Sequence, residues 1–335
     1  MLKTLTCLFI ISNSRTLGSE NNISCEQQFN HEDEDFMNIK DVIDLVKYPL
    51  DRPESTEYAD LIELCQTQLK QFGSVDLPGF IRDDVLQEMA AEVDNLPSHN
   101  RLNIVSAYGA ALDDEPDDEG LINPLNNGQD HPARRRFAQD VFAVAGDMVP
   151  GSALIRKVYH SPMVMRFLAR AQGKEVIYHM EDEFQNINVH YMYDGCARAW
   201  HYDGTDTVIT ILLQKPHQVD QSDILDIKKW FQGGEYEFAP FIRGAEKGEE
   251  NFEAVARLFE GSYDKSIVKD AEAGTLNLFN GQRSLHRVRS VYGARKRIIA
   301  ILSYDTKPHV QGAVQKNIKL YGERVAEIYK SRGQL

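Results

Sequence analysis

Two histidines and one aspartate have the types and spacing needed to bind a metal ion. His201 and Asp203 are separated by one residue and precede the apolar segment 208–213. Residues i and i+2 of an extended strand point to the same side, so the imidazole and the carboxylate can face one ion. His286 follows a second apolar segment, 275–279, and is the best third ligand. The pattern therefore predicts a mononuclear metal site.

Spacing alone does not single out this site. A histidine two residues before an acid also occurs at His31 and at His179. His31 lies in a polar leader segment, and no apolar strand follows His179, whereas one follows His201. An isolated histidine in a protein is usually an ordinary surface or core residue, but three ligands in this order favour a metal.

The donor set also indicates which metal is bound. Two imidazoles and one carboxylate on one face of an octahedral ion leave three positions open, and non-haem Fe(II) oxygenases use these for a bidentate co-substrate and dioxygen. Neutral imidazoles with a single carboxylate suit Fe(II) better than an ion that prefers thiolates. We therefore expect Fe(II), with O2 as a substrate.

A 2-oxoglutarate co-substrate would chelate the iron through its keto acid and present a distal carboxylate that needs a fixed cation. Arg295 and Arg297 lie 9 and 11 residues after His286 and open the apolar segment 298–304. Residues at this spacing share a strand face. We expect Arg297 to bind the carboxylate, with Arg295 as the alternative; a solvated cationic strand end is the other interpretation.

The elements that must position these residues change in character along the chain. Apolar residues recur at helical spacing through 37–94, and helices are predicted over 85–96 and 161–171. After residue 180, short β-branched and aromatic runs bounded by Gly, Asp and Pro predict strands. The predicted strands are 184–192, 208–213, 234–238, 275–279 and 298–304, with a further short one near 73–81. Helices outside a strand-rich core are expected.

The order HxD, His, Arg resembles the Fe(II)/2-oxoglutarate-dependent dioxygenases. The segments Gly233-Gly-Glu-Tyr-Glu-Phe238 and Ser284-Leu-His-Arg-Val288, with 297–304 and Leu320-Tyr-Gly322, resemble more closely the BesD/HalD-like free-amino-acid halogenases and hydroxylases. This resemblance covers roughly residues 70–325. It implies a mainly β fold with flanking helices (α+β) around a double-stranded β-helix, a cupin-like jelly-roll core.

The resemblance also implies the ligands His201, Asp203 and His286 and a 2-oxoglutarate site at Arg297. The halogenases replace the HxD carboxylate by Gly or Ala, which opens a position for chloride, but this chain retains Asp203. A hydroxylase that acts on an unactivated C–H bond of a small metabolite, a free amino acid, with release of succinate and CO2, is therefore implied. Desaturation, peptidyl side-chain hydroxylation at the same centre, and a catalytically silent protein that binds a metal or metabolite stay open.

Residues that bind the substrate are not determined by these motifs. Arg198, Asp206 and Ser303 lie near motif residues and could bind the charged groups of an amino acid, although each is equally compatible with a structural role. The polar segments 113–130 and 214–226 could close over the site or shape its mouth, or could be plain surface loops.

Composition excludes several classes of protein. With 51 acidic and 37 basic residues and a net charge of −14, the chain lacks the basic face expected of nucleic-acid or anionic-membrane binding. No apolar run reaches the about 20 residues that span a bilayer. The four cysteines (Cys7, Cys25, Cys65 and Cys196) form no CxxC pair and suit reduced thiols in the cytoplasm.

The first 36 residues are expected to lie outside the fold. The apolar run 5–11 after Lys3 could be a secretory signal, but no clean cleavage site follows it. The acidic block 32–35 requires purine-rich codons like those of a ribosome-binding site, which favours Met37 as the native start. Residues 37–335 are then expected to form one domain: a helical part of about 37–180, a jelly-roll core of about 181–305 and a C-terminal helical segment of about 306–335.

Overall fold

The computed structural model describes residues 39–94, 96, 100–108, 128–204, 208–216, 233–245 and 248–335, with the backbone alone for 103–108. Several features predicted above lie outside these ranges: the leader 1–36 with Met37, Asp206, and most of the polar segments 113–130 and 214–226.

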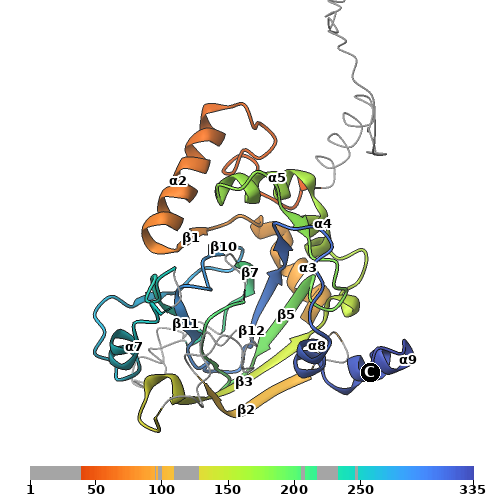
Figure 1. Ribbon diagram of the computed structural model, residues 1–335. Coiled ribbons are helices and arrows are strands. Elements are labelled where there is room, and N and C mark those ends of the chain that lie inside the picture. The colour runs from red at the N-terminus through yellow and green to blue at the C-terminus, as the bar shows by residue number, and fades with distance from the viewer. Residues whose placement is uncertain are drawn as a thin grey trace, which may run out of the picture.

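Two antiparallel sheets form the core of the protein (Figure 1). The larger has the order β1 (Ser74–Leu77), β10 (Leu276–Phe279), β7 (Val208–Gln214), β12 (Arg297–Leu302), β5 (Ile187–Met192), β3 (Arg136–Val144) and β2 (Asn100–Tyr108). The smaller has the order β6 (Arg198–His201), β11 (Leu285–Val288), β8 (Tyr236–Ala239) and β9 (Ile267–Lys269). Strands distant in sequence pair in both sheets, as in a jelly roll, which confirms the predicted fold class.

The strands of the larger sheet separate an apolar outer layer from an inner cavity. In β12, Ile298 and Ala300 are fully buried in the main hydrophobic core, while Arg297, Ile299 and Ile301 face a cavity between the sheets. This alternation has the period of two that a strand imposes. The inner residues of the neighbouring β5 are Asn188, His190 and Met192. One strand thus supplies both packing and the wall of a site.

Helices cover the outer face of the larger sheet (Figure 1). They are α2 (Thr56–Phe72), α3 (Asp83–Asp94), α4 (Leu154–His160) and α5 (Pro162–Ala171). Ser55 and Ser161 begin α2 and α5, each accepting a hydrogen bond from a backbone N–H of the first turn. No helix of the described ranges has the length and apolar character needed to cross a membrane.

The remaining helices lie beside the sheets. Helix α7 (Phe252–Phe259) packs against the smaller sheet, where the rings of Phe259 and Trp200 have centroids 6.3 Å apart. Helices α8 (Val314–Tyr321) and α9 (Glu323–Ser331) follow the last strands, and α8 contacts β2 and β3. A two-stranded ribbon pairs β4 (Tyr178–His179) with β13 (Tyr304–Asp305). Short 3-10 turns occupy Pro132–Arg134 and Gly146–Met148.

The expectation of a helical part over 37–180 needs correction. Strands β1, β2 and β3 come from this part and form three of the seven strands of the larger sheet. Residues 40–50 form turns rather than a helix, although Val42 and Ile43 are buried as their spacing predicts. Ile43 instead forms an isolated antiparallel bridge with Ile81. Apolar spacing therefore indicated some of the buried side chains, although Val46 of the same pattern is 91% exposed, and sheet partners far along the chain determine the backbone conformation.

Candidate metal centre

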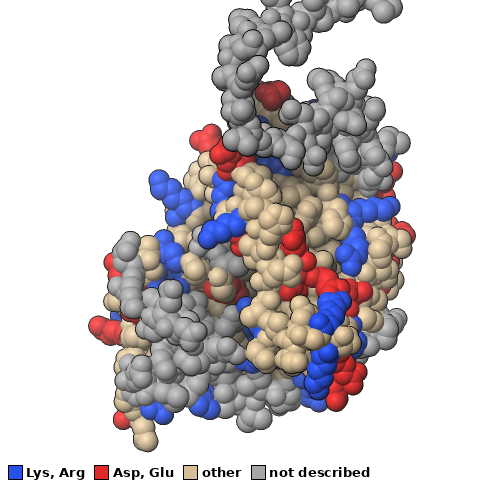
Figure 2. Space-filling model, turned by 45° about the vertical axis from the view of Figure 1, so that its right-hand side comes forward, with Lys and Arg blue, Asp and Glu red and all other residues tan. Residues whose placement is uncertain are grey.

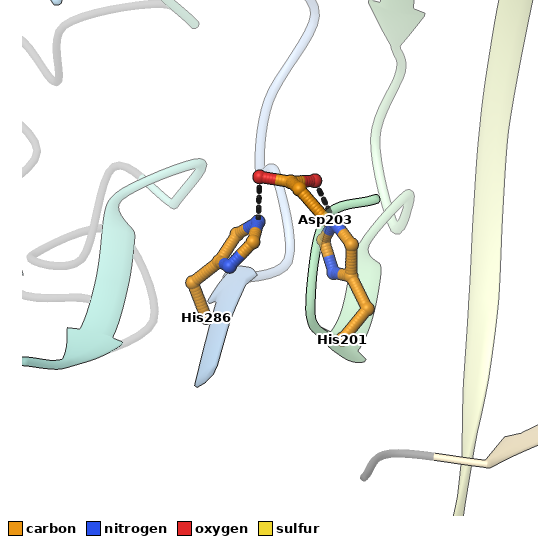
Figure 3. A group of neighbouring side chains, drawn as sticks. All are labelled: His201, Asp203 and His286. Atoms are coloured by element: carbon orange, nitrogen blue, oxygen red, sulfur yellow. Dashed lines mark ion pairs between the residues drawn. The ribbon is translucent and has the colours of Figure 1, made fainter. Parts of the chain in front are cut away.

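The predicted metal ligands lie together (Figure 3). His201 ends β6, and its direct partner across the smaller sheet is His286 of β11. Asp203 follows in the connection to β7 and places its carboxylate between the two rings. Its Oδ1 lies 3.7 Å from Nε2 of His201, and its Oδ2 lies 3.3 Å from Nε2 of His286. One ligand atom from each residue falls within 4.8 Å of the others.

Backbone carbonyls fix the orientation of both imidazoles. Nδ1 of His201 donates to the carbonyl of Ala199 at 2.8 Å, and Nδ1 of His286 donates to that of Ser284 at 2.9 Å. A carbonyl oxygen only accepts, so Nδ1 carries a proton in each ring, and in a neutral ring Nε2 keeps its lone pair. Both Nε2 atoms lie on the side of the Asp203 carboxylate, as second-shell hydrogen bonds orient metal-binding histidines.

The ionisation states also suit a metal. Burial lowers the pKa of His201 well below its usual 6.5, and the nearby His286 and Arg198 lower it further, against an opposing effect of Asp203. Burial alone would raise the pKa of Asp203, but His286, His201 and Arg198 together hold it well below its usual range. A neutral imidazole beside an ionised carboxylate is the state in which these groups bind a metal.

The Asp203 carboxylate has an unmet requirement that a cation would satisfy. Its Oδ2 is buried and accepts no hydrogen bond. The backbone N–H of Asp203 donates to the carbonyl of Gly281 at 3.1 Å, and a Cβ at Gly281 would lie 1.7 Å from Oδ2. A buried, unpartnered carboxylate oxygen is costly unless a cation neutralises it. Two imidazole nitrogens and this carboxylate fit an octahedral ion such as Fe(II).

The triad opens into a cavity of about 460 Å³ between the two sheets. Arg297 lines the same cavity, is only 5% exposed, and has its pKa lowered to about 10 by burial, so it stays charged at neutral pH. Arg295 lies outside the cavity before β12 begins, is exposed, and donates to the side chain of Gln214 at 3.3 Å. Of the two predicted cations, only Arg297 shares a cavity with the triad.

Arg297 and the metal ligands fit 2-oxoglutarate together with Fe(II). The metal would take the keto acid at the positions that the triad leaves open, and the buried guanidinium suits a carboxylate at the other end of the molecule. Gly234 allows the close approach of this arginine, because a Cβ there would lie 3.0 Å from Cδ of Arg297, and its φ of +75° already favours glycine.

Two further residues face the cavity and were not found from the motifs. Tyr236 has its ring 5.5 Å from that of His286, and burial with the charges of Asp203 and Asp76 raises the pKa of its hydroxyl well above 10. It is therefore a hydrogen-bond donor. His190 is kept neutral, because burial and the charges of Arg198 and Arg297 lower its pKa to about 3. Strand alternation within 184–192 and 234–238 was the available signal.

The other predicted site residues have different positions. Arg198 and Ser303 line the cavity. His179, which has the same spacing to an acid as His201, joins no metal-binding group within the described ranges: its Nε2 contacts the carbonyl of Tyr159 at 3.0 Å, while Glu181 pairs with His309. The structure therefore brings together the one triad favoured by the sequence context.

No protein-family model and no curated protein matches the chain. Solved structures that it resembles include an oxidoreductase of the 2OG-Fe(II) oxygenase family from Burkholderia pseudomallei (14% identity, TM-score 0.44, 74% of this chain and 92% of that one). A second is a prolyl hydroxylase from Trichoplax adhaerens in complex with a hypoxia inducible factor peptide fragment (15% identity, TM-score 0.44, 82% of this chain and 100% of that one). A third is the epimerase SnoN in complex with Fe3+, alpha ketoglutarate and nogalamycin RO (13% identity, TM-score 0.46, 74% of this chain and 84% of that one). These similarities are too weak to assign an activity, so function rests on the site residues. Fold and site define a jelly-roll protein whose cavity holds two histidines and one carboxylate that could bind one metal ion.

Proposed function

We propose that the chain is an Fe(II)- and 2-oxoglutarate-dependent oxygenase. The observation that carries this proposal is that one cavity holds the His201–Asp203–His286 triad together with a buried arginine, Arg297. A structural histidine cluster would not need a cation of this kind beside it. When bound, iron, 2-oxoglutarate and dioxygen supply the oxidising chemistry that hydroxylates a C–H bond and releases succinate and CO2.

The chain's own residues bind and orient the co-substrate, and they exclude water from the site. Arg297 holds the distal carboxylate of 2-oxoglutarate by a charge-assisted contact. The Tyr236 hydroxyl lines the same cavity as Arg297, whose charge acts on its pKa, and it donates a hydrogen bond to the same co-substrate. Apolar side chains of Leu212, Phe279 and Ile299 line the cavity and keep water from the reacting atoms. No side chain needs to act as a general acid or base.

The finer assignment is a hydroxylase of small metabolites. Asp203 supplies the carboxylate that the halogenases resembled by the motifs lack, so no coordination position is reserved for chloride. The motifs around 233–238 and 284–288, which resemble those of free-amino-acid halogenases and hydroxylases, favour a free amino acid as the substrate. Residues 37–335 would form a single catalytic domain, and the buried free thiols of Cys65 and Cys196 suit a reducing cytoplasm.

Anaerobic titration tests this function directly. Addition of 2-oxoglutarate to the Fe(II)-loaded protein is expected to produce the visible charge-transfer band of an iron-bound keto acid. Exposure to O2 with a pool of free amino acids should then give succinate, and one amino acid should gain the mass of one oxygen atom. A protein that binds neither Fe(II) nor 2-oxoglutarate would contradict the proposal; a band without succinate from any amino acid would contradict only the substrate class.

A further inference from the structure

We propose that His190 donates a hydrogen bond to a carboxylate of the substrate, which lies over β5 on the side of Arg297 away from Tyr236. This inference rests on the proposed iron and 2-oxoglutarate function, and it names the residue by which the site recognises an acid. The metal and the distal-carboxylate site leave His190 unused.

The first step is the hydrogen bonding of the side chains on the inner face of β5. His190, Asn188 and Met192 line the cavity from this face. Nδ2 of Asn188 donates to the carbonyl of Gln185 at 3.1 Å, and its Oδ1 accepts the hydroxyl of Tyr321. Neither ring nitrogen of His190 forms a hydrogen bond or ion pair with a described residue. Both nitrogens are therefore left for a ligand.

The second step is the distance between His190 and Arg297. In the register of β5 and β12, Met192 pairs with Arg297, and His190 pairs with Ile299. His190 and Arg297 are thus diagonal neighbours on one face of the sheet, about 7–8 Å apart and within reach of long side chains. A ligand bound against His190 consequently lies beside the arginine that holds 2-oxoglutarate.

The third step places 2-oxoglutarate and the substrate on opposite sides of Arg297. The ring of Tyr236 packs edge-on against that of Phe279 in β10, with centroids 5.1 Å apart. Strands β10 and β5 lie on opposite sides of β12 in the larger sheet. A 2-oxoglutarate molecule bound by Tyr236 and Arg297 therefore leaves the β5 side of the cavity to the substrate. Residues 310–313, held by Asp182 before β5, line the cavity on this side.

The fourth step is the charge around the imidazole. Burial lowers the pKa of His190 to about 3, and the charges of Arg198 and Arg297 contribute in the same direction. The ring is therefore neutral, with one N–H donor and one acceptor nitrogen. The positive field that disfavours a protonated ring favours an anion. A carboxylate accepts the imidazole N–H more strongly than a neutral carbonyl does, so this contact favours an acid over its carboxamide.

Three variants of His190 and a matched control test this contact. His190→Phe keeps a ring but removes both nitrogens, and His190→Leu removes them with a smaller side chain. His190→Gln keeps an N–H donor. His160→Phe makes the first change at an exposed residue that ends α4, outside the cavity. Thermal unfolding identifies the folded variants.

Each Fe(II)-loaded protein is titrated anaerobically with 2-oxoglutarate and then with each free amino acid and its carboxamide. The charge-transfer band reports 2-oxoglutarate binding, and the shift of the band reports the second ligand.

In the folded apolar variants, 2-oxoglutarate should bind within about twofold of wild type, because Arg297, Tyr236 and the metal still hold it. The affinity for the amino acid should fall about tenfold or more, as expected for loss of a hydrogen bond to a charged group. A wild-type preference of about tenfold for the acid over its carboxamide should disappear. His190→Gln should lie between the apolar variants and wild type, and His160→Phe should match wild type.

Four results would overturn the inference, and they are distinguishable. A folded apolar variant with unchanged amino-acid affinity and unchanged preference for the acid would overturn it alone. So would a loss of 2-oxoglutarate affinity as large as the loss of amino-acid affinity or larger, which would assign His190 to the co-substrate. A normal wild-type band that no amino acid shifts would overturn the inference together with the amino-acid substrate class. A wild-type protein with no band would overturn the proposed function, and the role of His190 with it.

Discussion

At the scale of single residues, three side chains have their bonding directions set before any ligand binds. Backbone carbonyls hold the two imidazoles with Nε2 toward Asp203, and Gly281 leaves room for the carboxylate. The spacing in the sequence identifies these ligands because HxD places two donors on one strand face. Tyr236 and His190 carry no such motif, and their approach to the site depends on which strands pair.

Removal of either imidazole should abolish the metal centre. His201→Ala and His286→Ala leave two ligands, so we expect loss of the charge-transfer band and of succinate formation. His309→Asn is the control, because the side chain of His309 is 79% exposed and pairs with Glu181 on the surface. Iron content and the band are measured for all three proteins. Iron-dependent turnover in either alanine variant would contradict the assignment of that ligand.

Substitutions of the two arginines near the start of β12 should have very different effects on 2-oxoglutarate binding. Arg297→Gln removes the buried cation, and we expect 2-oxoglutarate to bind about tenfold more weakly or worse. Arg295→Gln removes an exposed cation outside the cavity and should leave binding within about twofold, as expected of surface charges. Anaerobic titration of both variants with 2-oxoglutarate measures the difference. A larger loss in Arg295→Gln would assign the co-substrate to Arg295 instead.

At the scale of elements, the smaller sheet is held together on its outer face by a buried acid. Glu237 of β8 is 6% exposed and accepts hydrogen bonds from Arg287 of β11 and from Arg289, just after β11, at 2.8 Å from Nε of each. Arg287 also lies over the ring of Trp200 in β6. Strands β6, β9 and β11 have four residues or fewer and include charged or imidazole side chains, so no run of β-branched and aromatic residues reveals them. Cross-strand contacts of this kind determine them instead.

Glu237→Gln should loosen this sheet. The change leaves two guanidinium groups without their carboxylate, so we expect a loss of about 1–3 kcal/mol in the free energy of unfolding, measured by urea denaturation. Burial raises the pKa of Glu237, but hydrogen bonds from Arg289 and Arg287 lower it below the usual 4.5 overall. This stabilisation is therefore complete above about pH 4.5 and is lost as the pH falls through the lowered pKa. The exposed Glu327→Gln is the control, and equal stability of the two variants would refute this role.

At the scale of the whole molecule, the chain has a negative net charge, whereas the cavity beside the triad carries the positive charges of two arginines. The sequence carries a net charge of −14, and in Figure 2 acidic and basic side chains are interspersed on the visible described surface. The cavity nevertheless holds Arg198 and Arg297 beside the triad. Composition predicted the absence of a basic face but not this internal charge, because the arginines are brought inside by strands from separate parts of the chain.

The C-terminal segment completes the cavity through one buried acid. Asp182 is 2% exposed and lies before β5. Its Oδ1 accepts the backbone N–H groups of Phe184 and Gln185, and its Oδ2 accepts the N–H of Gly312 at 2.9 Å and Nδ2 of Asn317, on α8, at 2.7 Å. Residues 310–313 line the cavity. Asp182 thus holds the segment that forms one wall of the cavity, although Asp182 itself does not line the cavity.

Asp182→Ala should therefore affect substrate binding more than co-substrate binding. Three buried donors and the partly buried N–H of Gly312 lose their acceptor, and we expect a loss of about 3 kcal/mol or more in the free energy of unfolding, since each unsatisfied buried group costs about 1–3 kcal/mol. The released wall should raise KM for the amino-acid substrate, while 2-oxoglutarate, held by Arg297 and the metal, should bind within about threefold of wild type, or less than about 1 kcal/mol weaker. The exposed Asp264→Ala is the control. Equal losses for both ligands would show that the whole cavity, rather than this wall, depends on Asp182.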